Sequence, residues 1–194
     1  GGLRAVFAAM PKELRALLVS DVLIRFCEQM PYAYLAIWAM SSDRGARISG
    51  TEFGILTAIE MVVALLIYVP VAYLADQGSK KPFVLITFVN FTLFPIVLLF
   101  STGFWMLAVA FVVRGLKEFG EPTRKALIMD LAPEGRKAST FGSYYLVRDS
   151  IVSIAAFAGA WLWQVSEAAN LLTAAAFGVA GTIWFAARGR DRID

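Results

Sequence analysis

Six long apolar stretches, separated only by short polar connections, constrain this chain more than any other feature of its sequence. A helix needs roughly 20 mostly apolar residues to cross the hydrocarbon layer of a bilayer. The stretches run over residues about 14–40, 51–75, 83–100, 104–131, 139–164 and 171–187. We therefore predict an all-α membrane protein in which residues 1–194 form a single bundle of six transmembrane helices. Residues 1–12 form an amphipathic cytoplasmic lead-in that can lie along the membrane surface.

Composition agrees with burial in lipid and excludes several classes of function. Of the 194 residues, 59% are hydrophobic and 17% are charged, and mean hydropathy is +0.67, whereas soluble domains are less apolar and more charged. A large soluble helical bundle is the competing interpretation. Cys27 is the single cysteine and histidine is absent, so a disulfide within the chain and an imidazole metal site are excluded. Phosphate-binding and hydrolase motifs are also missing, and we expect no enzyme activity, no cofactor and no metal.

The basic residues in the connections and near the ends of the spans gather on one side of the predicted membrane. Twelve lie on the side of the termini: Arg4, Lys12, Arg15, Lys80, Lys81, Arg124, Lys125, Arg136, Lys137, Arg188, Arg190 and Arg192. The opposite loops hold two, Arg44 and Arg47. This bias follows the positive-inside rule and predicts a plasma (inner) membrane protein with both termini in the cytoplasm. It also explains the net charge of +3 without a nucleic-acid partner.

Ten charged residues fall inside the predicted spans and away from their ends: Asp21, Arg25, Glu28, Glu60, Arg114, Lys117, Glu118, Glu121, Arg148 and Asp149. Each would cost roughly 2.5 to 3.5 kcal/mol at mid-helix if it faced lipid, so they must face one another or water. Helical spacing places Asp21, Arg25 and Glu28 on one stripe of the first span. The same spacing groups Arg114, Lys117, Glu118, Glu121 and Lys125 on the fourth. We expect these two helices to line a polar interior and the uncharged third and sixth helices to face lipid.

Two interpretations of these charges stay open. Pairs such as Arg25 with Glu28, or Arg114 with Glu118, can be purely structural ion pairs. Alternatively, they bind solute, since ionisable groups inside a membrane are candidates for function. Glu60 has no basic neighbour at helical spacing. It is therefore either a reversible proton carrier or the partner of Arg25 or Arg148 from another helix.

The loop after the second span resembles the signature of the major facilitator superfamily, Gly-x-Leu-Ala-Asp-Arg-x-Gly-Arg-Arg. Here the sequence over residues 72–81 is Ala-Tyr-Leu-Ala-Asp-Gln-Gly-Ser-Lys-Lys. The Leu-Ala-Asp core and the closing basic pair match, whereas Ala72, Gln77 and Ser79 depart from the pattern. The resemblance implies a conformational latch, in which Asp76 accepts hydrogen bonds near the start of the fifth helix. Its members here would be Asp76, Lys80, Lys81 and Arg136.

The same resemblance implies half of a twelve-helix transporter, and the basic lead-in resembles the linker before the second half of such a protein. The chain begins with Gly1 and Gly2, so we expect it to be a processed, tagged or excised part of something longer. The predicted function is proton-coupled or facilitative transport of a small polar or charged solute by alternating access. The path would be lined by Arg25, Glu28, Arg114, Lys117, Glu118 and Glu121, with Glu60 as the proton-coupling candidate.

Its predicted partners are the lipid bilayer, the solute, and either a complementary six-helix half or a second copy of the chain. A membrane assembly module that moves no solute, or a channel-like subunit with a continuous pore, is the alternative.

Overall fold

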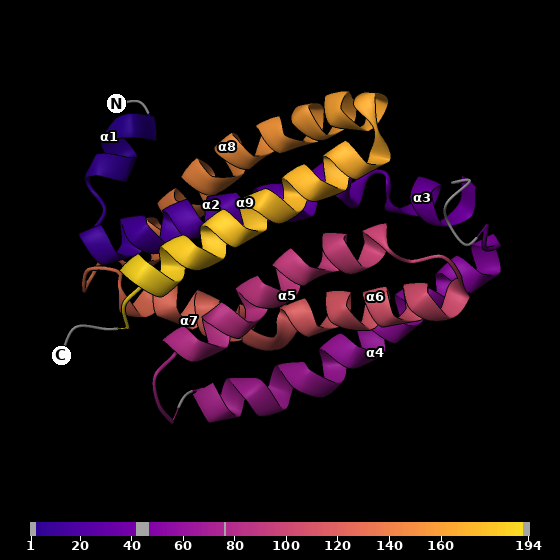
Figure 1. Cartoon of the computed structure of the whole chain (residues 1–194). Helices are drawn as coiled ribbons and strands as arrows, with labels where there is room; N and C mark the ends of the chain where they lie inside the picture. The colour runs from indigo at the N-terminus through magenta and orange to yellow at the C-terminus, as the bar shows by residue number, and fades with distance from the viewer. Residues whose placement is uncertain (1–2, 42–46, 76, 192–194) are drawn as a thin grey trace.

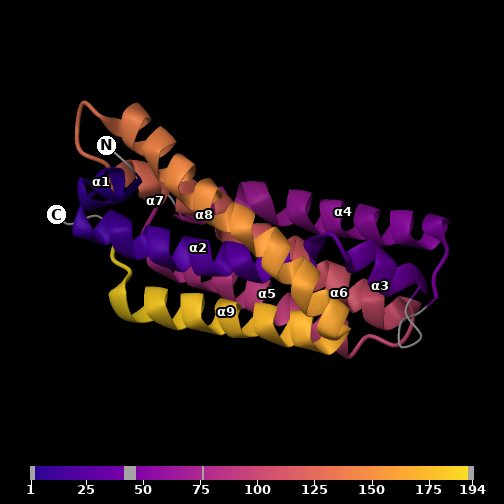
Figure 2. The ribbon, with the colours of Figure 1, turned by 90° about the horizontal axis from the view of Figure 1, so that it is seen from above.

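The structure, a computed structural model, describes residues 3–41, 47–75 and 77–191, and the regular secondary structure of these residues is helical throughout. The helices, in chain order, are α1 (Leu3–Ala8), α2 (Lys12–Tyr32), α3 (Leu35–Ser41), α4 (Gly50–Ala75), α5 (Lys81–Leu99), α6 (Phe104–Leu116), the short 3-10 helix η1 (Lys117–Gly120), α7 (Glu121–Asp130), α8 (Lys137–Val165) and α9 (Glu167–Arg188). The long helices run side by side, and α1 and the end of α9 lie at the same end of the bundle (Figures 1 and 2).

Four helices of the described residues are long and apolar enough to cross a membrane: α4, α5, α8 and α9. They coincide with the predicted second, third, fifth and sixth spans and extend them by at most four residues. The all-α class is thus confirmed, while the six crossings stay a prediction. The two remaining spans are the ones that carry the charged stripes, and each is divided into shorter helices.

The first predicted span divides after Tyr32, and the fourth divides around η1. Pro31 lies in the last turn of α2, where its ring removes a backbone hydrogen bond and α3 starts only at Leu35. Pro122 lies in the first turn of α7, directly after η1, where its missing N–H costs nothing. Proline alone does not divide a helix here, because Pro70 and Pro95 lie inside the continuous helices α4 and α5.

Gly120 explains how η1 fits against α5. Its backbone N–H donates a hydrogen bond to the hydroxyl of Thr87 on α5. A Cβ atom at this position would overlap the carbonyl group of Phe83, also on α5. The backbones of η1 and α5 therefore approach so closely that only glycine fits, which fixes the position of the division in the fourth predicted span.

The apolar helices are not equally buried, and the expectation that the third and sixth helices face lipid needs correction. In the most apolar segments of α5 and α9, 44% and 39% of the residues are buried, against 17% in α4 and 22% in α8. Helices α5 and α9 pack against each other and against α2, whereas Figure 1 shows α4 and α8 at opposite edges of the bundle. The absence of charged residues from these two spans indicated that they lie in apolar surroundings. The packed interior of the bundle is as apolar as lipid, so the sequence does not distinguish the two.

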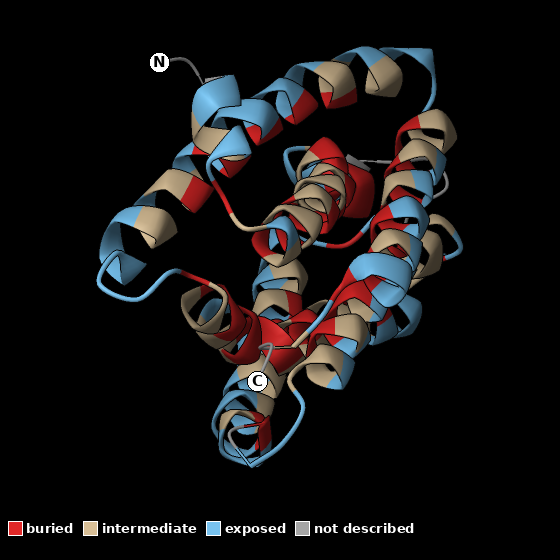
Figure 3. Ribbon diagram, turned by 90° about the vertical axis from the view of Figure 1, so that its left-hand side faces the viewer, coloured by how far each residue is buried: buried red, intermediate tan, exposed pale blue. Residues whose placement is uncertain are grey.

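Buried residues gather on the inward faces of the helices and exposed residues on the outward faces, as the ribbon colours show (Figure 3). The buried apolar residues form two large clusters. One is near the termini and contains Leu14, Leu17, Leu18, Phe88, Leu127 and Tyr144; the other, toward the opposite end, contains Leu35, Trp38, Leu98, Leu107 and Phe111. Residues 21–28 of α2 connect the two clusters. This middle layer of the bundle holds the charged site.

Candidate functional site: a buried charge network

The charged stripes of α2 and of the η1–α7 segment meet in the middle of the bundle. Together with one arginine of α8 they form a network of ion pairs. We call this set the charge network: Asp21, Arg25, Glu28, Lys117, Glu121, Arg124 and Arg148. The stripes predicted from helical spacing therefore do face each other, and they are joined by a basic residue from a third element.

Asp21 is the innermost member of the network. Its Oδ2 accepts hydrogen bonds from Nη1 of Arg124 at 2.6 Å, from the hydroxyl of Tyr144 at 3.0 Å and from Nη1 of Arg148 at 3.4 Å. The side chains of Asp21 and Arg124 are each 1% exposed. A carboxylate removed so completely from water is tolerated only with partners of this kind, so Asp21 ties α2 to α7 and α8.

A second layer of the network is less deeply buried. Arg25 donates to Glu28 at 2.5 Å and to Glu121 at 3.1 Å, and Lys117 donates to the other oxygen of Glu28 at 2.6 Å. The side chains of Arg25, Glu28 and Lys117 are 11–18% exposed. The ring of Phe91 lies 5.2 Å from the Arg25 guanidinium carbon and 5.4 Å from the Lys117 ammonium. These groups are held in place by their ion pairs and remain partly exposed.

Arg114 and Glu60 form a separate ion pair. Nη1 of Arg114 on α6 donates to Oε2 of Glu60 on α4 at 2.9 Å. Arg114 is flanked by the rings of Tyr32, Phe94 and Phe111 at 5.6 to 5.9 Å. Of the two alternatives for Glu60, the structure thus supports pairing with another helix, although the partner is Arg114 and not Arg25 or Arg148.

Glu118 differs from its neighbours because it forms no hydrogen bond or ion pair within the described part of the chain. It lies with Glu60 on a cavity of about 320 Å³ that is otherwise lined by apolar side chains of α4, among them Ala64, Leu65 and Tyr68. The predicted pair of Arg114 with Glu118 is therefore not formed, whereas the predicted pair of Arg25 with Glu28 is. Glu118 therefore lines this cavity with a carboxylate that has no hydrogen-bond or ion-pair partner among the described residues.

Arg124 occupies the inward position that we expected for Lys125. The expectation that Arg124 lies in a loop is wrong, because Arg124 is a buried residue of α7. An α-helix turns by about 100° per residue and a 3-10 helix by about 120°. The four residues of η1 therefore add roughly 80° of rotation, which brings Arg124 onto the stripe of Arg114 and turns Lys125 outward. Glycine followed by Glu-Pro at residues 120–122 was the available signal for this change of register.

Arg148 and Tyr144 are the other members of the site that spacing did not select. They lie one helical turn apart on α8, and both are buried. Arg148 also pairs with Asp149 at 2.8 Å and stacks on the ring of Tyr145, 4.0 Å from its centre. A tyrosine and an arginine four residues apart in a predicted span are a signal that could have identified this face of α8.

Of the four predicted latch residues, Asp76 lies outside the described residues. Lys80 pairs with Asp130 at the end of α7 at 2.9 Å, and the backbone N–H groups of Lys80 and Lys81 donate to Asp191 at 2.9 and 2.8 Å. Arg136 directly precedes α8 and lines a cavity together with Val6 of α1 and residues 9–11. The loop before α5 is thus fixed to the ends of α7 and α9, and the latch itself stays a prediction.

Comparison with protein families identifies the class of this chain. The family model described as Major Facilitator Superfamily matches residues 17–193, which is most of the sequence. A comparison with curated proteins finds no significant match.

The chain therefore belongs to the major facilitator superfamily, and its resemblance to this family is confirmed. The family and the apolar helices define an integral membrane protein of the major facilitator transporter type, which implies a lipid bilayer and a small solute as partners. Members of this family are transporters, not enzymes. The length of 194 residues is consistent with a half of such a transporter.

Proposed function

We propose that this chain is one half of a secondary transporter that moves a small polar or charged solute by alternating access, either proton-coupled or facilitative. The observation that carries the proposal is the charge network, with ion pairs from α2, η1, α7 and α8 buried among helices that are otherwise apolar. Ionisable groups at this depth are expensive, and a solute path is the use that explains so many of them together.

The proposed path is lined by six residues: Arg25, Glu28, Arg114, Lys117, Glu118 and Glu121. The two layers of the network have different roles. Asp21 and Arg124 hold the helices together from the fully buried side, while Arg25, Glu28 and Lys117 keep 11–18% of their side chains exposed. A polar solute replaces one ionic partner of Arg25, Glu28 or Lys117. The ion pair of Asp21 with Arg124 stays intact during this exchange, so no fully buried charge is left unpaired.

Glu60 is the proposed proton-coupling residue, and its pair with Arg114 supplies a mechanism. When Glu60 carries a proton, the pair loses its negative charge and Arg114 is left without a carboxylate. An anionic group of the solute then takes that place, so proton binding and solute binding favour each other. Glu118, on the same cavity as Glu60, provides a second carboxylate through which a proton or a cationic group passes.

The exposed faces of α4 and α8 support the proposal of a partner half. Large apolar side chains are exposed along both helices: Met61, Leu65, Leu66, Val69 and Tyr73 on α4, and Leu146, Ile154, Phe157, Trp161 and Val165 on α8. These faces suit lipid or a second six-helix unit, which is either a complementary half or another copy of the chain. We further propose a plasma (inner) membrane location, cytoplasmic termini, and a latch formed by Asp76, Lys80, Lys81 and Arg136.

The first test is the mass of the detergent-solubilised chain by light scattering, followed by flux into proteoliposomes under an imposed proton gradient. A pH-sensitive dye inside the liposomes reports proton movement after addition of amino acids, organic acids or sugars in turn. We expect Glu60→Gln and Glu118→Gln to reduce solute-dependent flux. Glu134→Gln, in the exposed loop before α8, is the matched control and leaves the flux unchanged.

Three outcomes separate this proposal from the alternatives. A dimer with gradient-driven flux that the two variants abolish supports a self-completing transporter. A monomer without flux points to a half that needs a complementary partner, so flux must appear when that half is supplied. Flux that continues in both variants and never saturates with solute concentration indicates a channel-like subunit and contradicts alternating access.

A further inference from the structure

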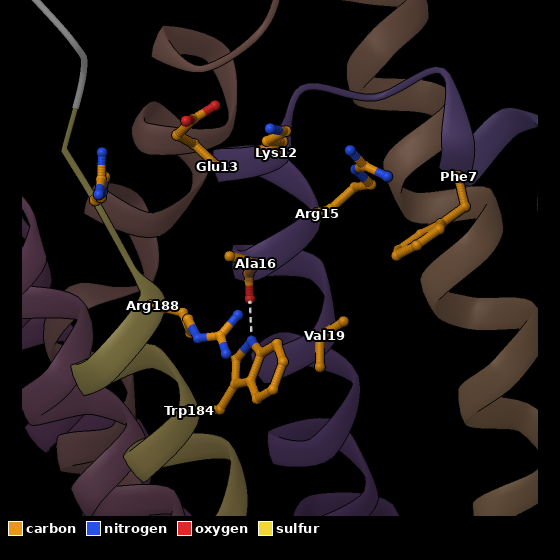
Figure 4. Close-up of a pocket in the computed structure, with 9 residues that line it drawn as sticks. Phe7, Lys12, Glu13, Arg15, Ala16, Val19, Trp184 and Arg188 are labelled. Carbon is orange, nitrogen blue, oxygen red and sulfur yellow. Dashed lines mark hydrogen bonds between the residues drawn. The ribbon is translucent and has the colours of Figure 1, made fainter.

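A large cavity opens at the end of the bundle where α1, α2 and α9 meet, at the start of the helix that carries Asp21, Arg25 and Glu28. Its volume is about 750 Å³ (Figure 4). It is lined by Phe7 of α1, by Lys12, Glu13, Arg15, Ala16 and Val19 of α2, by Trp184 and Arg188 in the last turns of α9, and by Arg190, which follows α9. Four basic side chains against one acidic side chain give this basic cavity an excess of positive charge.

Aromatic rings hold two of these basic groups on opposite sides of the basic cavity. The guanidinium carbon of Arg188 lies 5.1 Å from the centre of the Trp184 ring, and that of Arg15 lies 5.9 Å from the centre of the Phe7 ring. The indole N–H of Trp184 donates to the carbonyl oxygen of Ala16 at 3.1 Å, which joins α9 to α2 (Figure 4). The ring contacts and this hydrogen bond thus hold Arg15, Arg188 and Trp184 around one cavity.

The basic side chains of the cavity have their charges available for a ligand. Among the described residues, Lys12, Arg15, Arg188 and Arg190 take part in none of the ion pairs. This distinguishes them from the charge network, in which every basic group has a carboxylate partner. Clustered cations without partners attract an anion, and the planar guanidinium of arginine matches the geometry of phosphate and carboxylate groups.

A second cavity continues from the basic one toward the middle of the bundle. Its volume is about 500 Å³, and Phe7 and Val19 line both cavities. Apart from Arg4, its lining is apolar and consists of Phe7, Leu18, Val19, Val22, Leu23, Val147 and Ile151. Along α2, the step from Arg15 to Val22 covers roughly 10 Å toward the membrane interior. We call this second cavity the apolar groove.

We propose that the basic cavity and the apolar groove together bind one molecule of an anionic phospholipid. The phosphate lies between Arg15 and Arg188, and one acyl chain runs along the apolar groove between α2 and α8. Basic pockets between helices on the cytoplasmic side of a membrane are suited to anionic headgroups, and the chain of a lipid is what an adjoining apolar groove accommodates. A free phosphate ion would occupy only the first of the two cavities, whereas a phospholipid occupies both.

The test is the apparent affinity of the purified full chain for dioleoylphosphatidylglycerol, measured by native mass spectrometry in a neutral detergent. Dioleoylphosphatidylcholine, glycerol 3-phosphate and inorganic phosphate are the comparison probes. We expect Arg15→Gln with Arg188→Gln to weaken binding of phosphatidylglycerol by at least about 10-fold. Lys125→Gln with Lys137→Gln removes the same charge from exposed sites outside both cavities and leaves the affinity unchanged.

The apolar groove has its own variant. Ile151→Trp fills the groove and should weaken binding of phosphatidylglycerol, whereas Ile183→Trp, at an exposed position of α9, has no effect. Arg15→Lys with Arg188→Lys keeps the charge and should retain most of the affinity, which separates lost binding from lost folding.

Equal weakening by the pocket and control charge variants contradicts a defined site, as does equal affinity for phosphatidylcholine. Binding of glycerol 3-phosphate or phosphate as tight as that of the lipid also overturns the proposal, in favour of a site for a soluble anion.

Discussion

The charge network and the Arg114–Glu60 pair are both buried ion pairs in the same bundle, yet they are built differently. In the network, Asp21 contacts Arg25, Arg124 and Arg148, and Glu121 contacts Arg25 and Arg124, so each of these two carboxylates has more than one opposite charge nearby. Glu60 and Arg114 have one ionic partner each, and both touch apolar or aromatic surroundings otherwise.

This difference separates the charges that stabilise the structure from those that are able to change partners. Losing one member of a shared network leaves the others with remaining partners but breaks the contact that joins three helices. Losing one member of an isolated pair leaves a single unpaired charge next to a cavity, where a proton or a solute can compensate it. We therefore assign stability mainly to Asp21 and Arg124, the fully buried layer of the network, and proton coupling mainly to the Arg114–Glu60 pair.

The largest expected effect comes from Asp21→Asn. The side chain of Asp21 is 1% exposed, and the substitution leaves Arg124 and Arg148 next to a neutral group in this buried site. We therefore expect the free energy of unfolding to fall by about 3 kcal/mol. Unfolding by sodium dodecyl sulfate in mixed micelles measures the loss. Asp149→Asn removes the same charge from a side chain that is 60% exposed and should change stability little. Equal losses in both variants would contradict the special role of Asp21.

A smaller effect is expected when the close contact between η1 and α5 is disturbed. Gly120→Ala places a Cβ against the carbonyl of Phe83 and should cost about 2 kcal/mol, because one backbone must move. The displacement also rotates Arg124 away from Asp21, so the cost should shrink in an Asp21→Asn background. Gly142→Ala on α8 meets open space and is the control. Thermal unfolding in detergent measures all four variants.

The isolated pair should show a smaller coupling than the network. In a double-mutant cycle of Glu60→Gln and Arg114→Gln, we expect an interaction energy of about 1 kcal/mol. The corresponding cycle of Asp21→Asn and Arg124→Gln should give a clearly larger value, since both side chains are almost fully buried. A larger coupling for Glu60 with Arg114 would reverse the assignment of stability to the network.

The smallest effect sets the scale for the others. Ser166 begins α9, and its hydroxyl accepts a hydrogen bond from the N–H of Ala169 at 2.9 Å. Ser166→Ala should cost about 0.5 kcal/mol, the usual lower range for loss of an N-cap, and should leave flux unchanged. The same micelle unfolding assay provides the number. An effect as large as that of Asp21→Asn would show that the assay does not resolve local contributions.

Sequence alone predicted the apolar helices and the charged stripes well, because both depend on residue type and helical spacing. Helices α4, α5, α8 and α9 follow the predicted spans closely. The divisions at Tyr32 and at η1 were not predicted, because a proline inside an apolar span is compatible with a continuous helix, as Pro70 and Pro95 show. Whether a helix divides depends on the packing of its neighbours, such as the contact of Gly120 with α5.

The candidate site was predicted in part for the same reason. Arg25, Glu28, Lys117 and Glu121 were selected by spacing, and they do form ion pairs with one another. Arg124 was missed because the rotation added by η1 changes the register of the stripe. The partner of Glu60 was missed because contacts between different helices depend on how those helices pack, which spacing along one helix does not determine.

The most direct test of the account is whether water reaches the cavity beside Glu60 and Glu118 in the membrane. Cys27 is 1% exposed, so we expect its labelling to be negligible. Glu118→Cys should then react with a membrane-impermeant maleimide in vesicles, whereas Thr123→Cys in the buried interior and Ile183→Cys on the exposed apolar face of α9 should not. Labelling of Glu118→Cys that a transported solute slows supports a solute path. No labelling at this position, from either side of the membrane, would mean that the cavity faces lipid and would contradict it.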